Sequence, residues 1–483
     1  MAQIEIIFNI KKFTKKDRDL ITKAYDFAKN AHHGQLRKSG EPYFVHVFTT
    51  AKNLAELGAN SNMIAAGFLH DTLEDTAVEE QELQKEFGPD ITGMVLGITK
   101  LGKVKYTGIE RNVENLRKFF VSIAEDMRVI VIKLADRLHN IETLEHLQPE
   151  KQKRIALETL EVFAPLADRL SMGRLKGRLE DAAFPYAYPK EYEEVKLLRE
   201  TRKDSALPEL LKVEKNIKKI FKEYSLSPIQ IDYREKHLYS LWKKLQKYKM
   251  DIAHVYDIIA MRIMVKNIEE CYLALGLIHG SYKPLPGRIK DYIALPKPNG
   301  YKSLHTTIIT ENGSIIEIQI RTIEMHDEAE YGLAAHFIYK ENLSADNDQY
   351  SWIKELRDTQ NNEGDIKNFF KNLKTDFFHD RVFAFTPKGE IVNLPEDGSV
   401  LDFAFGVHSE IGMHAEAGEV NGKYAKLDHK LRNGDVVKII TNKKINPTSK
   451  WLSYTKSSIA RKHIERYIKQ HSLLNRLLSF NQK

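Results

Sequence analysis

The stretch MIAAGFLHDTLED, residues 63–75, places an apolar run directly before one histidine and three carboxylates. If residues 63–75 form a helix, side chains four residues apart lie on the same face. On that helix His70 and Glu74 are four residues apart, as are Asp71 and Asp75, so they form two adjacent stripes. Because neighbouring carboxylates repel one another, we expect a cation among them.

The metal hypothesis needs further ligands from other parts of the chain. His46 in EPYFVHV and Asp136 in KLADRLHN are the candidates, each flanked by apolar residues at helical spacing. Imidazole and carboxylate together suit Mn²⁺, Zn²⁺ or Fe²⁺, and oxygen-rich sets favour Mn²⁺. Taken alone, each residue is better explained as a capping or ion-paired group, with Asp136 bound to Arg137 or Arg128. The set as a whole favours a metal site.

Composition and length limit the class of protein. The chain has 483 residues and a net charge of +7, from 74 Lys and Arg against 67 Asp and Glu. A mild basic excess suits anionic partners such as nucleotides or RNA, or a solvated basic surface. One cysteine, Cys271, and no apolar run near the roughly 18 residues of a membrane span predict a soluble cytoplasmic protein without disulfides.

The pattern along the chain predicts several domains. Helical periodicity dominates until FPYAYPKEYEEV, where two prolines and three tyrosines indicate a boundary. Strand-like runs such as IIAMRIMV and SIIEIQI then alternate with helical ones. We expect an all-α domain at 1–195, an α/β domain with a mixed sheet at 196–340, a linker at 341–375, a small β-rich domain at 376–442 and the start of a helical region at 443–483.

A second candidate site begins in DYREKHLYSLWKKL. Lys236, Ser240 and Lys244 recur every four residues, with Arg234 just before them. On a helix this is a cationic stripe with a hydroxyl, suited to the phosphates of a nucleoside triphosphate. A solvated basic helix face is the alternative.

The segment GRIKDYIALPKPNGYKSLHTT predicts a shaped loop, because it contains two prolines and a glycine. A tyrosine beside a lysine can stack on a base while the cation meets phosphate. RNA binding is the alternative. The cations Arg288, Lys290, Lys297, Lys302 and His305 surround Tyr292 and Tyr301.

The stretch SIIEIQIRT predicts a strand with isoleucines on one face and Glu317, Gln319 and Arg321 on the other. The polar face could simply be a solvated sheet surface. It could also aim Glu317 at the basic loop, with Asp257 as a second carboxylate for Mg²⁺. Phosphoryl-type transfer needs these parts: cations on the phosphates, a carboxylate-held Mg²⁺ and a base.

A histidine, a His-Asp pair and a distant Asp in a helical domain resemble the HD phosphohydrolases. The strings GQLRKSGEPYFVH, FLHDTLEDT, GITKL, VIVIKLADRLHN and ETLEVFAPLADRL are similar to the hydrolase domain of the RelA/SpoT homologues, which make and destroy ppGpp and pppGpp. The resemblance covers nearly all of the chain. It implies hydrolysis of (p)ppGpp to GDP or GTP and pyrophosphate. In that reaction Mn²⁺ would be bound by His46, His70, Asp71 and Asp136, and water would be activated by Glu74 and Asp75. The implied nucleotide contacts are Arg37, Lys38, Ser39, Asn140 and Thr143.

The second site resembles the nucleotidyltransferase-like alarmone synthetase domain, which transfers the β,γ-pyrophosphate of ATP to the 3′-hydroxyl of GDP or GTP. The resemblance implies Mg²⁺ on Asp257 and Glu317, with Glu317 also helping to deprotonate the hydroxyl. It also implies ATP contacts from Arg234, Lys236, Ser240 and Lys244, and guanosine-nucleotide contacts from Lys297, Asn299, Tyr301 and His305. The basic form of Arg288-Ile-Lys290-Asp291 accompanies bifunctional members of the family.

The stretch from DRVFAFTPKGEI to LRNGDVVKIIT resembles a TGS domain, a small β-grasp module. That resemblance implies contact between His408 and the 3′ end of uncharged tRNA on the ribosome. The alternative is an intramolecular brake in which His408 is merely packed. Because the family usually continues beyond the point matching Lys483, we expect either a truncated chain or a short natural form.

Four positions depart from the family pattern: Val47 stands for Pro, Glu142 for Arg, Asp168 for His and Gly177 for Trp. None removes a proposed metal ligand or the Glu-Asp pair. The leading hypothesis is a bifunctional alarmone enzyme of the stringent response, with segment 180–225 linking its two sites. One alternative has one site silent and hydrolysis dominant. The other is a ribosome- or tRNA-binding regulatory sensor.

Overall fold

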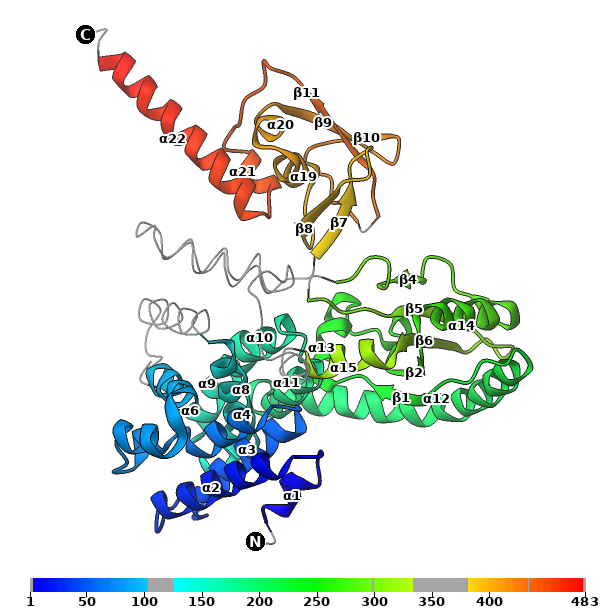
Figure 1. The fold of residues 1–483 in the computed structure, drawn as a ribbon. Helices are drawn as coiled ribbons and strands as arrows, with labels where there is room; N and C mark the ends of the chain where they lie inside the picture. Colours follow the sequence, from blue (N-terminus) through cyan, green and yellow to red (C-terminus); the bar gives the residue numbers. More distant parts are fainter. Residues whose placement is uncertain (1–2, 103–125, 298, 333–380, 433, 481–483) are drawn as a thin grey trace. The chain divides into compact units, whose positions relative to one another are not determined.

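The computed structural model describes residues 3–102, 126–297, 299–332, 381–432 and 434–480. The chain forms two compact units, Met1–Asn361 and Asn362–Lys483. The first unit contains a helical part followed by an α/β part (Figure 1). The predicted linker at 341–375 lies outside the described residues.

The N-terminal part is helical, as predicted. Its central helix, α4 (Ser61–Leu69), is apolar on all sides and is buried from Met63 to Leu69. It packs against α2, α3, α6 and α8. The other helices are α1 (Glu5–Phe8), α2 (Lys15–Ala31), α3 (Tyr43–Glu56), α5 (Thr72–Asp75), α6 (Glu80–Gly102), α8 (Met127–Glu142), η1 (Leu144–His146), α9 (Pro149–Glu158), η2 (Thr159–Phe163), α10 (Ala164–Arg169) and α11 (Gly173–Ala187).

Residues 63–75 do not form one continuous helix, because α4 ends at Leu69 and α5 begins at Thr72. Two side chains occupy carbonyls that a continuous helix would use. The Nδ1 of His70 lies 2.8 Å from the carbonyl oxygen of Gly67, and the Thr72 hydroxyl donates to that of Leu69 at 2.6 Å. His70 and Asp71 therefore sit at a junction between helices.

The α/β part contains the predicted mixed sheet, with the strand order β1-β2-β6-β5-β3 and β4 paired with β5. Only β2 and β6 are parallel among these pairs. Its elements are α12 (Pro189–Glu223), β1 (Gln230–Glu235), α13 (Leu238–Lys247), η3 (Ile252–His254), β2 (Ile259–Val265), α14 (Ile268–Ser281), β3 (Lys283–Pro284), β4 (Lys290–Asp291), β5 (Leu304–Ile309), β6 (Ile315–Thr322) and α15 (Ile323–Tyr331).

Strand β6 alternates as predicted, with Ile316, Ile318 and Ile320 buried in the core. The opposite face is not a solvated surface, since Gln319 is 4% and Arg321 1% exposed. Glu330 of α15 accepts from Arg321 at 3.2 Å and from Arg262 at 3.0 Å, which compensates the charge of the buried Arg321 guanidinium group. The polar face of the sheet therefore lies in the protein interior, where its charged side chains are paired.

Helix α11 of the helical part meets α13 of the α/β part through polar contacts. Asp181 lies 2.8 Å from Nδ1 of His237, and Glu180 accepts from the Ser240 hydroxyl at 2.7 Å. Gly177 makes room for this approach, because a Cβ at that position would lie 2.0 Å from Nε2 of His237. The Gly departure from the family pattern thus has a steric partner in this chain.

We expect Gly177→Ala to lower the free energy of unfolding by about 1–3 kcal/mol, as overpacking does elsewhere. The His237 ring cannot turn away from the added methyl group without losing its contact with Asp181. Thermal or urea denaturation of the single variant measures the cost. Combining it with His237→Ala should recover part of the loss; strict additivity of the two effects would show that this contact is not the cause.

The second unit combines a β7–β8 hairpin, a three-stranded antiparallel sheet in the order β10-β9-β11, and helices that share one core. Buried Asp402 accepts hydrogen bonds from the backbone amides of Lys456 and Ser457 at 3.0 and 2.8 Å. This contact ties α19 to the segment before α22. The elements are β7 (Arg381–Phe385), β8 (Ile391–Pro395), α19 (Val400–Val407), α20 (Ser409–Met413), β9 (Ala415–Val420), β10 (Lys423–Ala425), β11 (Val437–Thr441), α21 (Trp451–Tyr454) and α22 (Ser458–Phe480).

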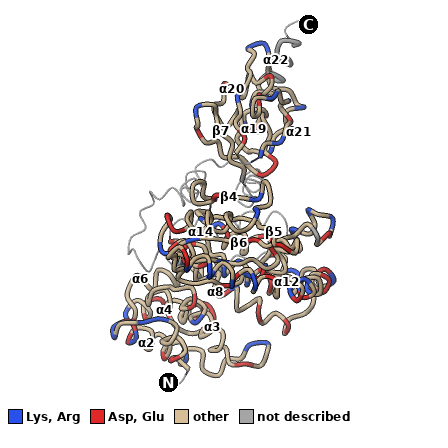
Figure 2. The backbone as a smooth tube through the Cα atoms, turned by 90° about the vertical axis from the view of Figure 1, so that its right-hand side faces the viewer, with Lys and Arg blue, Asp and Glu red and all other residues tan. Residues whose placement is uncertain are grey.

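Charge is distributed along the whole backbone. Figure 2 shows lysine and arginine interspersed with aspartate and glutamate in both units rather than gathered in one segment. Among the described residues, every helix is too short or too polar to cross a membrane.

Candidate active sites

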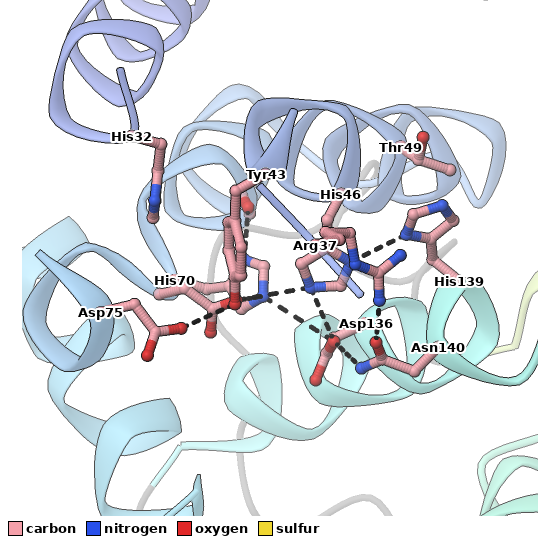
Figure 3. A network of polar contacts seen from close by, with 12 residues as sticks. His32, Arg37, Tyr43, His46, Thr49, His70, Asp75, Asp136, His139 and Asn140 are labelled. Carbon is pink, nitrogen blue, oxygen red and sulfur yellow. Dashed lines mark hydrogen bonds and ion pairs between the residues drawn. The ribbon is translucent and has the colours of Figure 1, made fainter. Parts of the chain in front are cut away.

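The four predicted ligands of the first site come together at the meeting point of α3, the α4–α5 junction and α8. His46, His70 and Asp136 point toward one another (Figure 3), and their ligand atoms lie within 4.8 Å. The Nε2 of His46 is 3.2 Å from Asp136 and 3.4 Å from Asp71. The Nε2 of His70 is 3.1 Å from Asp71.

The orientation of both histidines suits a cation. Each turns Nε2 to the centre while Nδ1 contacts the protein: His46 Nδ1 lies 2.8 Å from His139, and His70 Nδ1 2.8 Å from the Gly67 carbonyl oxygen. The Nε2 of His70 is buried and faces the carboxylates of Asp71 and Asp136, at 3.1 and 3.8 Å. Two imidazoles and two carboxylates form a donor set for a divalent metal. This cluster can hold one.

The pKa shifts agree with a site built for positive charge. Burial, the largest influence, disfavours the charged form of His70, but Asp71 and Asp136 outweigh it and raise the pKa of His70 to about 9. Burial also disfavours the charged form of Asp71 and by itself would raise the pKa of this carboxyl group. The nearby His70 and His46 outweigh burial and hold that pKa well below its usual range. Without a metal, a proton on His70 balances the carboxylates.

Asp136 is held by neighbours on its own helix. Lys133 donates to one carboxylate oxygen at 2.7 Å and Asn140 to the other at 2.5 Å. The alternative partners named for Asp136 are wrong: Arg128 binds Asp126 and Asp90, and Arg137 binds Glu158. The carboxylate is therefore fixed at a defined orientation by residues one turn away.

Arg37 reaches the same helix. Its guanidinium donates to Asn140 at 2.8 Å and to the Thr143 hydroxyl at 3.1 Å. Three of the five predicted nucleotide contacts are thus adjacent. The other two, Lys38 and Ser39, are less closely tied to this group: Ser39 contacts Glu41, and Lys38 follows Arg37 in the same loop.

The acidic pair Glu74 and Asp75 lies on α5, beside the ligands. Partial burial and the charge of Asp71 raise the pKa of Glu74, as suits a proton acceptor. Asp75 accepts from the Tyr43 hydroxyl at 2.6 Å, and the same hydroxyl is 2.7 Å from Asp71. One phenol therefore joins a candidate ligand to a candidate catalytic carboxylate.

Sequence reasoning missed Tyr43, Lys133 and His139. Their helical spacing could have found them, because Tyr43 is three residues before His46, while Lys133 and His139 are three residues on either side of Asp136. Burial lowers the pKa of His139 to about 3, aided by the nearby His46 and Arg37, so its imidazole stays neutral.

We expect Tyr43→Phe to reduce turnover at this site about 10- to 100-fold, the usual range for residues that support metal ligands. The variant keeps the ring stacked on His32 but leaves Asp71 and Asp75 without a shared donor. Steady-state kinetics measure the effect, which should appear in kcat and not in KM. A selective rise in KM would instead make Tyr43 a substrate contact.

The second site centres on Asp257, just before β2. One carboxylate oxygen accepts from Lys236 at 2.7 Å and pairs with Lys244 at 2.8 Å. The other is buried without a hydrogen-bond partner. Burial opposes ionisation, but the two lysines keep the pKa of Asp257 well below its usual range. An ionised oxygen without a partner is a fitting ligand for a hard cation such as Mg²⁺.

Glu317 projects from β6 toward the same region. Burial and the charge of Asp257 raise its pKa, but contacts with His305 outweigh them and leave that pKa below its usual range. His305 Nδ1 is 3.4 Å from Glu317, and its Nε2 is 2.8 Å from the Tyr301 hydroxyl. Lys297 lies over the ring of Tyr301 at 5.2 Å. A cation, an aromatic ring and a carboxylate therefore adjoin, as the sequence predicts.

Three predicted contacts differ from expectation. Lys236 precedes α13, so the proposed helical stripe of Lys236, Ser240 and Lys244 is wrong, although both lysines still meet at Asp257. Ser240 donates to Glu180 of α11. Asn299 donates to the Asp168 carbonyl at 3.2 Å, and its own carbonyl accepts from Ser171.

Arg234, the fourth predicted ATP contact, is exposed at the end of β1 and lies near enough to act electrostatically on Tyr301.

In the second unit, His408 caps α20. Its Nδ1 accepts from the Glu410 amide at 3.3 Å, and the residue is exposed. His408 is therefore not packed inside its own domain.

Comparison with known proteins matches three family models: the HD domain over residues 24–173, the region found in RelA / SpoT proteins over 233–344, and the TGS domain over 382–441. These ranges coincide with the helical site, the mixed sheet and the β-rich unit. The chain therefore contains an HD domain, the region found in RelA / SpoT proteins and a TGS domain, in that order.

Two curated members of the RelA/SpoT family match most of the chain. The guanosine-3′,5′-bis(diphosphate) 3′-pyrophosphohydrolase of Aquifex aeolicus is 44% identical, covering 93% of this chain and 64% of the relative. The bifunctional (p)ppGpp synthase/hydrolase SpoT of Escherichia coli is 39% identical, again covering 93% and 64%. The chain spans just under two thirds of the length of these relatives.

Among solved structures, the small alarmone synthetase 2 from Bacillus subtilis is 26% identical, with a TM-score of 0.24. The match covers 35% of this chain and 91% of the synthetase chain.

Proposed function

We propose that this chain is a bifunctional alarmone enzyme of the stringent response. The observation that carries the proposal is the presence of two separate sites in one chain that gather carboxylates around a candidate metal position: His46, His70, Asp71 and Asp136 at the first, and Asp257 with Glu317 at the second. A pure binding protein has no need for two such centres. The names of two relatives, a 3′-pyrophosphohydrolase and a bifunctional (p)ppGpp synthase/hydrolase, support (p)ppGpp hydrolysis at one site and (p)ppGpp synthesis at the other.

At the first site the four ligands would hold Mn²⁺, which when bound would polarise a water molecule and screen the phosphates. Arg37, steadied by Asn140 and Thr143, binds the nucleotide with Lys38 and Ser39. Glu74 accepts the proton of the attacking water and Asp75 positions that water. The bond from phosphorus to the 3′-oxygen breaks, and GDP or GTP leaves with pyrophosphate as the second product.

At the second site Asp257 and Glu317 would hold Mg²⁺, whose charge would stabilise the transferred pyrophosphate. Lys236 and Lys244 meet at Asp257 and offer ammonium groups to the phosphates of ATP, with Arg234 and Ser240 as further contacts. Tyr301 stacks on guanine beside Lys297, Asn299 and His305. Glu317 accepts the 3′-hydroxyl proton as the oxygen of GDP or GTP attacks the β-phosphorus and AMP leaves.

We also propose domain limits of 1–195, 196–340, 341–375, 376–442 and 443–483, and contact between the TGS domain and uncharged tRNA on the ribosome through His408. Exposure of His408 supports that contact, because a ligand can reach its ring.

A hydrolase-dominant chain is the second candidate. Ser240 is engaged by Glu180, and Asn299 by the segment at Asp168 and Ser171. Two proposed synthetase contacts are therefore bonded to the hydrolase part in this conformation and must be released before they can bind nucleotide.

The test is turnover by metal-stripped protein. With ppGpp and added Mn²⁺ we expect GDP and pyrophosphate; with ATP, GDP and Mg²⁺ we expect ppGpp and AMP. Hydrolysis alone would favour the second candidate, and the absence of both reactions would contradict the proposed function.

A further inference from the structure

His139 is a buried histidine that lies outside the proposed ligand set. It is 6% exposed, and its ring lies nearly parallel to that of His46, with centroids 5.0 Å apart and planes 20° apart. Its Nδ1 lies 2.8 Å from Nδ1 of His46. Figure 3 shows the two rings side by side, with His46 between His139 and Asp136. A contact this short requires one proton between the two nitrogens.

That shared proton has only one position compatible with metal binding. A neutral imidazole carries a single N–H. If His139 donated, the proton of His46 would sit on Nε2, the atom that faces Asp136 and Asp71, and Nε2 would have no lone pair for a cation. If His46 donates, Nε2 is free to bind. The acceptor role of His139 therefore selects the tautomer of His46 that can act as a ligand.

We propose that His139 is a positioning residue that accepts the Nδ1 proton of His46 and so presents Nε2 of His46 to a divalent cation; this inference rests on the proposed hydrolase function. The partner of a metal-binding histidine is ordinarily a carboxylate, a backbone carbonyl or water. His70 follows that rule through the Gly67 carbonyl. His46 uses a second imidazole.

Helix α8 makes this arrangement rigid. The carbonyl of His139 accepts from the Thr143 hydroxyl at 2.9 Å, and the neighbouring Asn140 binds Asp136. One face of α8 thus carries the candidate ligand Asp136 and also His139, the partner of the ligand His46. Asn140 and Thr143 on the same face hold these two residues in place. Displacing His139 would disturb the orientation of His46 without removing any ligand.

The test compares Mn²⁺ affinity, measured by competition with a fluorescent chelator, across variants of position 139. In His139→Asn the amide oxygen can stand where Nδ1 stood, so we expect a dissociation constant within about threefold of the wild type. In His139→Gln the amide is one carbon too far, and in His139→Leu no acceptor remains. Both should bind Mn²⁺ about 10- to 100-fold more weakly. His146→Leu, at an exposed histidine of η1, is the matched control.

A double-mutant cycle separates this role from packing. If His139 acts through His46, then adding His139→Leu to His46→Ala should weaken binding no further. Equal affinity of the Asn, Gln and Leu variants, or an undiminished effect of His139→Leu in the His46→Ala background, would overturn the inference. Circular dichroism and melting temperature identify any variant that fails to fold. If His139→Leu fails, the comparison of Mn²⁺ affinity between His139→Asn and His139→Gln tests the inference. If the wild type itself binds no Mn²⁺, the proposed hydrolase function fails first.

Discussion

Asp136→Asn is expected to reduce Mn²⁺-dependent hydrolysis of ppGpp by about 10³-fold or more, equal to about 4 kcal/mol of transition-state stabilisation. The change keeps the size of the side chain but removes a negative charge that faces His46 and His70. It also leaves Lys133, which now donates to Asp136, beside a neutral amide. The measurement is pyrophosphate release at saturating ppGpp, with Mn²⁺ affinity determined in parallel.

The control for this variant is Asp19→Asn, an exposed carboxylate on α2 in the same domain. It should leave hydrolysis unchanged. The synthetase reaction of Asp136→Asn should also persist, because Asp257 and Glu317 are untouched. Hydrolysis at wild-type rate in Asp136→Asn would remove Asp136 from the ligand set, whereas loss of both activities would indicate unfolding.

Sequence patterns predicted the fold class well, because periodicity follows directly from burial. The alternation in β6 and the apolar character of α4 both reflect side chains that are buried in the folded protein. The break after Leu69 could not be read in the same way. It depends on the side chains of His70 and Thr72 taking backbone carbonyls, a local competition that leaves no trace in hydrophobic spacing.

The candidate sites were predictable in their charged residues and less so in their supports. Metal-binding residue types stand out in a sequence, so His46, His70 and Asp136 were found. The residues that orient them stand at helical spacing from the ligands, but their roles depend on tertiary contacts: Tyr43 meets Asp71 and Asp75, and His139 meets His46, only because the helices pack together. Contacts between domains, such as Asn299 with Asp168, depend on tertiary packing alone.

Glu317→Gln is expected to reduce ppGpp synthesis from ATP and GDP by about 10²- to 10⁴-fold, the range associated with a general base. Glutamine retains an oxygen that can accept from Gln319, which now binds Glu317 at 3.0 Å, so the local packing should persist. It cannot take a proton from the 3′-hydroxyl, and it is a poorer ligand for Mg²⁺. The measurement is the rate of ppGpp formation at saturating nucleotides.

Glu311→Gln is the matched control, because Glu311 is an exposed glutamate in the turn between β5 and β6. It should synthesise ppGpp at the wild-type rate. Hydrolysis by Glu317→Gln should be unchanged, since the Mn²⁺ ligands lie in the helical part. If synthesis survives in Glu317→Gln, another group must accept the proton, and His305, 3.4 Å from Glu317, is the next residue to replace. If synthesis and hydrolysis fall together, the substitution acts on the contacts that join the two domains and not on the chemistry of one site.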